Sequence, residues 1–290
     1  MQQQHSGLSV PASEGVLRVL FGLFMAFIAL VLAVAPVPEL FAAMTVLAMV
    51  FGAREWHRLV RSPEQRRIAD RKPLHIQTAI TGVSIALAVM ALMLHQFPVA
   101  LVLIVGGAVA AFVMARRRDD NPLWHAFGVL YLGLPALALA GLRAFPTAAQ
   151  GTWTIVALFL IVWSTDTGAL VFGKLIGGKK LWPAVSPGKT WAGTIGGTFT
   201  ALMVFAMFAG LLSLKMLPSL AFAAGLSIIA HLGDLFESWV KRRFNTKDSG
   251  GLIPGHGGIL DRMDSIFAAS VALAIMVFGL GLHPTFGGLS

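Results

Sequence analysis

Three aspartates with the potential for chemistry stand inside or beside long apolar stretches. Asp166 lies in VWSTDTGALVFGK, and Asp234 lies in AHLGDLFESWVKRR with no lysine or arginine within one helical turn. Asp264 lies in ILDRMDS, three residues after Asp261. A charged side chain at the centre of a bilayer costs roughly 2.5–3.5 kcal/mol on insertion scales, so these carboxylates are candidates for function. For Asp166 the alternative is helix packing, with hydrogen bonds from neighbouring serine and threonine side chains.

The carboxylates recur at helical spacing, which favours a shared site. A helix would place four polar residues on one face: Asp234, Glu237, Ser238 and Lys241. An acid-to-base ladder would stabilise that helix end, but it leaves Asp234 unexplained. Asp261 and Asp264 also share a face, and N-terminal capping is their alternative role. A few carboxylates that leave room for water and phosphate are typical of a Mg²⁺ site.

The run GGLIPGHGG, residues 250–258, separates these two groups of carboxylates. Its glycines leave backbone N–H groups unobstructed, and such loops form anion-binding nests. Lys247, His256 and Arg262 supply positive or proton-donating side chains, and Asp248 stands next to Lys247. The run is therefore a candidate phosphate-binding loop, with a plain turn between helices as the alternative.

A second candidate phosphate-binding segment is SPGKTW, residues 186–191. It resembles the end of a P-loop, but Pro183 stands where that motif requires glycine and no βαβ pattern surrounds it. The weaker prediction is that Lys189, with Ser186 or Thr190, binds phosphate. A flexible loop is the alternative.

Several other chemistries are excluded or unsupported. The chain has no cysteine, which excludes disulfides, thiolate metal sites and thiol catalysis. His231, His256 and His283 do not have the spacing of zinc ligands.

The elements that must position these residues are membrane helices. The 290 residues are 57% hydrophobic and 12% charged, and the mean hydropathy is +0.79. Soluble domains carry about 25% charged residues, so lipid surrounds most of this chain. The fold class is an all-α polytopic membrane protein with about nine spans, although the Pro36-Val37-Pro38 break leaves eight or ten open. The predicted spans are residues 16–35, 38–53, 77–95, 97–115, 123–142, 152–174, 191–213, 217–236 and 265–283.

The basic residues predict the orientation of these spans. If the N-terminus lies in the cytoplasm and the loops alternate, 20 of the 22 lysines and arginines fall on the cytoplasmic side. The two exceptions are Arg143 and Lys215. The net charge of +9 is then a topology signal, and nucleic acid is not an expected partner. The same count places both candidate phosphate-binding segments on the cytoplasmic face.

Residues 233–265, GDLFESWVKRRFNTKDSGGLIPGHGGILDRMDS, resemble the signature of the phosphatidate cytidylyltransferases. That signature runs Ser-x-x-Lys-Arg, Lys-Asp, Pro-x-His-Gly-Gly and Asp-Arg-x-Asp, and every part is present. Upstream, DTGA at 166–169, Gly173-Lys174 and SPGKTW resemble the family's other polar segments. Ala192 and Leu170 depart from the pattern as we know it, but neither removes a group that the chemistry needs.

The resemblance implies transfer of the cytidylyl group of CTP to phosphatidate with Mg²⁺, in the cytoplasmic (inner) membrane. It leaves room for a second, monovalent cation and implies a possible homodimer. Residues 1–150 would be N-terminal helices for lipid access or dimerisation, and residues 151–290 the catalytic domain. The implied metal ligands are Asp234 and Asp261. The implied catalytic residues are Asp234, Asp261, Asp264, Lys247, His256 and Arg262. The implied substrate-binding residues are Asp166, Lys174, Ser186, Lys189, Thr190, Ser238, Lys241, Asp248, Gly257 and Gly258.

Three alternatives remain at this point. A transporter of an anionic solute would place paired polar half-helices near the midplane, whereas the charges here gather at one face. A related enzyme could use CTP with another lipid phosphate or a polyprenol as acceptor. A structural scaffold would leave the carboxylates unexplained.

Overall fold

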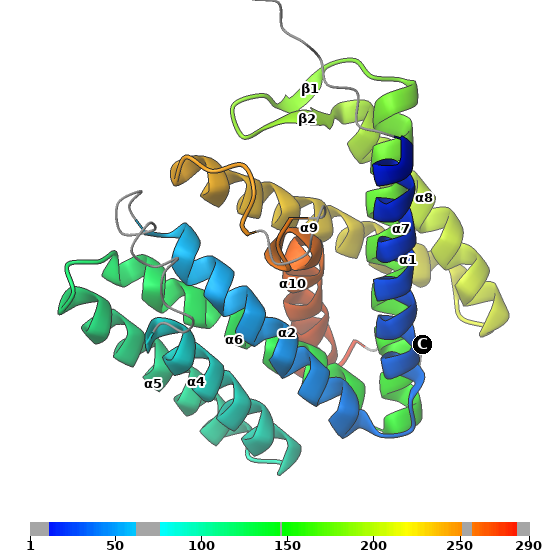
Figure 1. Cartoon of the computed structure of the whole chain (residues 1–290). Helices are drawn as coiled ribbons and strands as arrows, with labels where there is room; N and C mark the ends of the chain where they lie inside the picture. The colour runs from blue at the N-terminus through cyan, green and yellow to red at the C-terminus, as the bar shows by residue number, and fades with distance from the viewer. Residues whose placement is uncertain (1–11, 62–75, 146, 251–256, 283–290) are drawn as a thin grey trace, which may run out of the picture.

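The structure, a computed structural model, describes residues 12–61, 76–145, 147–250 and 257–282. Long helices dominate these ranges (Figure 1). The helices of the N-terminal half are α1 (Ala12–Val34), α2 (Pro38–Leu59), α4 (Ile76–Met93), α5 (Phe97–Arg116) and α6 (Pro122–Ala144). The C-terminal half contains α7 (Ala148–Leu175), α8 (Trp191–Leu211), α9 (Met216–Arg243) and α10 (Leu260–Ala274), which continues as the short π-helix η1 (Ile275–Gly279).

The helical, multi-pass class is confirmed, whereas the number of spans and their orientation stay predictions. Each predicted span coincides with a helix, but in the described parts of the chain seven helices are long and apolar enough to cross a bilayer. One helix outside those seven is α2, whose sequence includes Glu39, Arg54 and Glu55. The other is α1, whose part described at side-chain level, Gly22–Val34, is shorter than a span.

A small hairpin lies between α7 and α8, and its two short strands leave the all-α class unchanged. Strands β1 (Lys180–Trp182) and β2 (Ser186–Thr190) pair antiparallel, with Trp182 opposite Ser186 and Lys180 opposite Thr190. The segment SPGKT is therefore an ordered strand and not a flexible loop. The hairpin stands at one end of α7 and α8 (Figure 1).

Proline and threonine set where several helices begin. Pro38 and Pro122 are the first residues of α2 and α6, where a missing N–H is tolerated. Thr147 and Thr190 precede α7 and α8 as N-caps. Each hydroxyl oxygen accepts a hydrogen bond from the backbone N–H group three residues later in the chain. Thr190 thereby joins β2 directly to α8.

Glycines bring α7 and α8 into close contact. A Cβ on Gly193 would lie 2.8 Å from the carbonyl oxygen of Ala169, and one on Gly197 would lie 2.6 Å from that of Thr165. Small residues of this kind allow two membrane helices to approach backbone to backbone. The close approach places the start of α8, and β2 before it, beside the half of α7 that carries Asp166.

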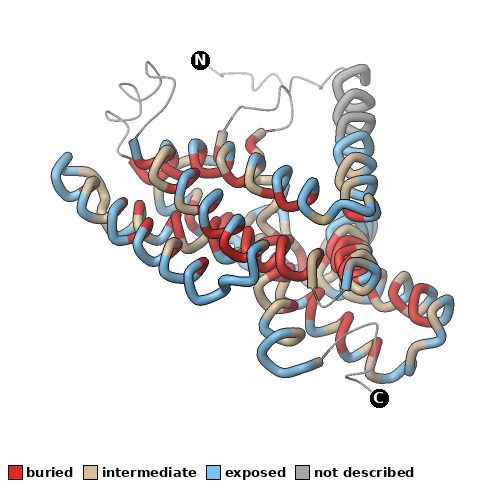
Figure 2. Tube along the Cα trace, turned by 90° about the horizontal axis from the view of Figure 1, so that it is seen from below, coloured by how far each residue is buried: buried red, intermediate tan, exposed pale blue. Residues whose placement is uncertain are grey.

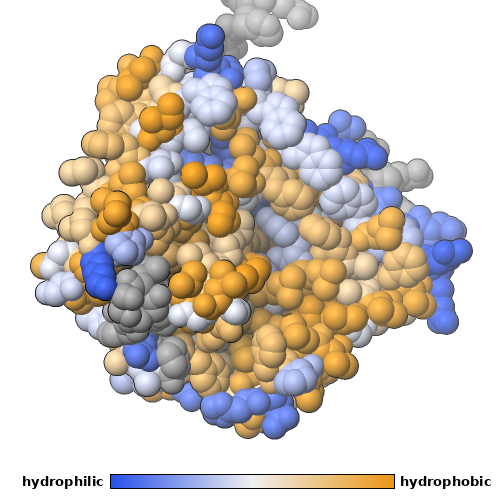
Figure 3. All heavy atoms as spheres, turned by 180° about the vertical axis from the view of Figure 1, so that it is seen from behind, coloured by the Kyte–Doolittle hydropathy of each residue, from blue (hydrophilic) through white to orange (hydrophobic). Residues whose placement is uncertain are grey.

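Helix α6 joins the two halves, because it packs against α2, α4, α5, α7 and α10. Trp56 of α2 is fully buried against it and donates a hydrogen bond from Nε1 to the carbonyl oxygen of Trp124, 2.9 Å away. Buried residues follow the facing sides of the helices, and exposed ones follow the outer sides (Figure 2). The face seen in Figure 3 is mostly apolar, with hydrophilic residues mainly at its margins, as a lipid-exposed protein requires.

Candidate functional site

Lys189 of the hairpin forms an ion pair with Asp234 of α9. The Nζ of Lys189, on β2, lies 2.5 Å from Oδ2 of Asp234. Both side chains keep about a quarter of their surface exposed, 23% for Lys189 and 28% for Asp234, but the Nζ atom of Lys189 is itself buried. The structure thus joins two residues that the sequence analysis assigned to separate segments.

Two further carboxylates converge on this ion pair. Asp166 of α7 accepts a hydrogen bond from the hydroxyl of Ser265 on α10, at 3.2 Å. The neighbouring Asp264 is close enough to Asp166 and Asp234 for their charges to interact. We call Asp166, Asp234 and Asp264 the carboxylate cluster. Because it draws one residue from each of three helices, it depends on the packing of the C-terminal half.

A glycine on α9 allows this convergence. A Cβ on Gly233 would lie 2.8 Å from the carbonyl oxygen of Asp264 and 2.7 Å from the Cβ of Ala268. Any side chain at position 233 would therefore push α10 away from α9. The absence of a side chain at Gly233 lets the backbones of α9 and α10 come into contact next to Asp234 and Asp264.

Asp261 lies one turn before Asp264, and its carboxylate holds the two ends of the glycine-rich run together. It accepts hydrogen bonds from the backbone N–H groups of Ser249 and Gly258, at 3.1 and 2.9 Å. The Ser249 hydroxyl and the Nζ of Lys241 add contacts of 2.9 and 2.7 Å. Gly257 has a φ of +83°, a left-handed conformation that favours glycine. Asp261 therefore has a structural role in addition to any role toward a ligand.

Lys241 also serves a buried carboxylate on its own helix. Its Nζ lies 3.3 Å from Oε1 of Glu237, which has no exposed surface. One ammonium group thus lies between the carboxylates of Glu237 and Asp261. The spacing of Glu237 and Lys241 on one helical face predicted their proximity, and it is confirmed.

Glu55 of α2 is a site residue that the sequence analysis missed. Its carboxylate is buried and accepts hydrogen bonds from the backbone N–H groups of Ile259 and Leu260, both at 3.0 Å, at the start of α10. The Ser249 hydroxyl, at 3.3 Å, connects Glu55 to Asp261. Its position at the end of an apolar run could have drawn attention to Glu55. No sequence signal pairs it with a loop about 200 residues away.

The Glu55 carboxylate also explains two of the glycines. A Cβ on Gly250 would lie 2.7 Å from Oε1 of Glu55, and a Cβ on Gly258 would overlap Oε2 of Glu55 and the Ser249 hydroxyl. The bare backbone at these two positions is needed because both glycines lie directly against a side chain from the N-terminal half.

The other predicted site residues lie around this centre. Ser238 is buried on α9, and Thr190 is buried with its hydroxyl occupied as the N-cap of α8. Ser186 is half-buried on β2. His256 lies outside the described residues. Four predicted charged residues are exposed: Lys174, Lys247, Asp248 and Arg262.

A hard divalent cation that also binds substrate needs only a few protein oxygens. In the described ranges, no group of three or more His, Cys, Asp or Glu side chains is arranged as a complete metal site. Mg²⁺ commonly takes one or two protein carboxylates and completes its shell with water and substrate phosphates. Asp234 and Asp261 both face an ammonium group, so each already binds a cationic partner. The residues present are therefore compatible with Mg²⁺ between protein and substrate.

Comparison with known proteins gives a consistent result. The sequence model of the cytidylyltransferase family matches residues 16–280. The chain is 45% identical over 166 residues to the phosphatidate cytidylyltransferase of Brucella suis biovar 1 (strain 1330), covering 56% of this chain and 60% of the relative. It is 47% identical over 135 residues to the phosphatidate cytidylyltransferase of Staphylococcus aureus (strain COL), covering 46% of this chain and 52% of the relative. The matched segments thus span between half and two thirds of these relatives.

Proposed function

The chain belongs to the cytidylyltransferase family, and from this premise we propose that it transfers the cytidylyl group of CTP to phosphatidate. The products are CDP-diacylglycerol and pyrophosphate. The observation that carries the proposal is the carboxylate cluster paired with Lys189, which lies in the C-terminal halves of α7 and α9 and near the start of α10. A lipid acceptor accounts for the helices, and a nucleoside triphosphate accounts for a charged and partly exposed site.

The reaction requires no nucleophile from the protein. An oxygen of the phosphatidate phosphate attacks the α-phosphorus of CTP, a new P–O bond forms, and the bond to the β-phosphate breaks to release pyrophosphate. Catalysis therefore consists of placing two anionic substrates in line and balancing their charge. Lys189 would contact a substrate phosphate once its ion pair with Asp234 opens.

Asp234 and Asp261 would hold Mg²⁺, with Asp264 as a direct or outer ligand. When bound, the ion would supply positive charge to the phosphates of CTP and to the leaving pyrophosphate. A second, monovalent cation is compatible with the excess of carboxylates. The charged residues Lys247, Arg262 and Lys174, with the backbone at Gly257 and Gly258, would contact phosphates.

The remaining assignments follow the same premise. Asp166, Ser186, Thr190 and Ser238 would complete the pocket, while Lys241 and Asp248 would orient neighbouring groups. His256 would bind phosphate or assist proton transfer. We place the enzyme in the cytoplasmic membrane with this site facing the cytoplasm, as the distribution of basic residues favours. A homodimer is proposed from the family resemblance.

The direct test uses purified protein in detergent with labelled CTP, Mg²⁺ and a panel of lipid phosphates that includes a polyprenyl phosphate. We expect labelled CDP-lipid with phosphatidate, none with the other acceptors, and none when EDTA removes the metal. The matched variants are Asp234→Asn and Asp261→Asn, which should abolish product while the protein elutes as a folded species. Product from another acceptor alone would refute the choice of phosphatidate. Normal turnover in both variants would refute the metal assignment.

A further inference from the structure

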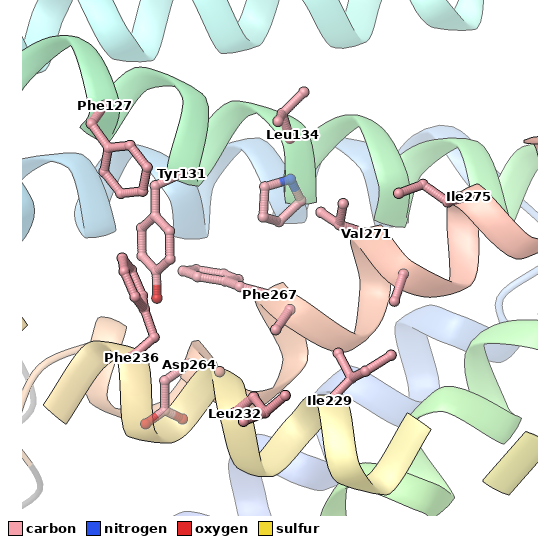
Figure 4. Close-up of a pocket in the computed structure, with 14 residues that line it drawn as sticks. Phe127, Tyr131, Leu134, Ile229, Leu232, Phe236, Asp264, Phe267, Val271 and Ile275 are labelled. Carbon is pink, nitrogen blue, oxygen red and sulfur yellow. The ribbon is translucent and has the colours of Figure 1, made fainter. Parts of the chain in front are cut away.

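An apolar groove runs between α6, α9 and α10, and it ends at the carboxylate cluster. Its volume is about 430 Å³, within the range of roughly 300–1,000 Å³ that is usual for small-molecule sites. Figure 4 shows its walls: Phe127 and Tyr131 from α6, Leu232 and Phe236 from α9, and Phe267 and Val271 from α10. Asp264 lies at one end of this lining.

The groove is open to the surroundings of the protein along its length. Leu134, Leu232 and Ile275 line it and are 40%, 58% and 59% exposed. In a membrane protein such apolar side chains face the hydrocarbon region. A hydrocarbon chain could therefore enter the groove from the side without crossing water.

The dimensions of the groove match one leaflet of a bilayer. Asp264 on α10 and Ile275 at the start of η1 mark its ends, and eleven helical residues rise about 16 Å. Half of a hydrocarbon core of roughly 30 Å is about 15 Å. An acyl chain whose head lies at Asp264 would fill the groove down to the middle of the membrane.

One polar group interrupts the apolar walls. The hydroxyl of Tyr131 is buried and has no hydrogen-bond partner within the part of the chain that the structure describes. Its ring is fixed between Phe236 and Phe267, with ring centroids 5.5 Å away in both cases. The hydroxyl points toward the side of the groove where Asp264 lies (Figure 4). Burying a hydroxyl without a partner is costly, so this donor is expected to bind a ligand.

We propose that this groove binds one acyl chain of the lipid substrate and that the Tyr131 hydroxyl donates a hydrogen bond to an oxygen at the head of that chain. The proposal rests on the proposed function for the identity of the lipid. It assigns to the N-terminal half a direct contact with substrate. It also places the lipid phosphate next to Asp264, on the same side as Lys189 and Asp234.

The test exploits the fact that Tyr131 is the only tyrosine in the chain. Protein grown with 3-fluorotyrosine should give one ¹⁹F NMR signal in nanodiscs of phosphatidylcholine. We expect phosphatidate to shift this signal in proportion to its fraction in the bilayer, without CTP. Because phosphatidylcholine is present throughout, a shift reports selective binding. No shift with phosphatidate would overturn the proposal, and so would an equal shift with diacylglycerol, which lacks the phosphate.

Val271→Trp should fill the groove, and Val102→Trp is its control on an exposed face of α5. We expect Val271→Trp to abolish the ¹⁹F shift and to raise the KM for phosphatidate about tenfold. A loss of this size corresponds to about two methylene groups of the acyl chain that can no longer be buried in the groove. The KM for CTP should stay unchanged in both variants. Tyr131→Phe keeps the ring and should lower kcat/KM for phosphatidate by about three- to tenfold.

These readouts separate the groove from the proposed reaction. If phosphatidate shifts the ¹⁹F signal but no CDP-lipid forms, the groove stands and the proposed function fails. If CDP-diacylglycerol forms with the same KM for phosphatidate in Val271→Trp and Tyr131→Phe, the groove proposal fails and the function stands.

Discussion

Glu55→Gln is the substitution that most directly tests how the site is built. Glutamine has the size of glutamate, but one carboxylate oxygen becomes an NH₂ group. Glu55 accepts from the N–H groups of both Ile259 and Leu260, so the variant must lose one of these bonds and set an N–H group against another. A hydrogen bond to a charged group contributes about 1.5–3 kcal/mol, and a buried donor left without a partner costs about 1–3 kcal/mol.

We therefore expect Glu55→Gln to lose roughly 2.5–6 kcal/mol at the start of α10. The local effect should appear as faster hydrogen exchange at the amides of Ile259 and Leu260, measured by mass spectrometry of the detergent-solubilised protein. Turnover should fall as well, because Asp261 and Asp264 belong to the same turns. Glu39→Gln is the matched control, since Glu39 is exposed on the same helix. Unchanged exchange and unchanged turnover in Glu55→Gln would refute the assignment of Glu55 as the anchor of this segment.

Three further predictions concern the surrounding structure. Gly128→Ala should lower the thermal unfolding midpoint by an amount equivalent to about 1–3 kcal/mol, because the new methyl group would overlap the Trp56 ring; Gly106→Ala, with open space around it, should not. Thr190→Ala should remove the N-cap of α8 at a cost of about 1 kcal/mol, whereas Thr190→Ser should retain it. Burial raises the pKa of Asp120, but the hydrogen bond and charge of His125 and the hydrogen bond of Arg61 outweigh this effect. The net result is a pKa lowered to about 2. This stabilisation is complete above the ordinary pKa near 4 and is lost as pH falls toward 2, so the advantage of the wild type over Asp120→Asn should shrink by about 2 kcal/mol in that interval.

Much of the fold could be predicted from local sequence, because lipid requires long apolar helices and the proline and threonine signals mark where they start. The hairpin could not, since β1 and β2 are three and five residues long and include a proline and a glycine. Their pairing depends on the helices that hold both ends. The family resemblance was confirmed because it rested on an ordered set of polar residues, which chance rarely produces.

The site could be predicted only in part. Residue spacing placed Glu237 near Lys241 and Asp261 near Asp264, since both pairs lie on one helix. The ion pair between Lys189 and Asp234 joins a strand to a helix 45 residues later and leaves no periodic signal. Contacts of this kind depend on tertiary packing, so sequence could identify the participants but not their partners.

The bond between Glu55 and Leu260 has a consequence for how the protein is made. The acceptor is synthesised 205 residues before its donor. While the ribosome is still translating the intervening helices, Glu55 has to remain without the N–H groups that later satisfy it. The loop around Asp261 can close only after the turn at Ile259 and Leu260 has emerged. Nascent chains that stop short of that turn should therefore lack activity even when every earlier helix has been inserted.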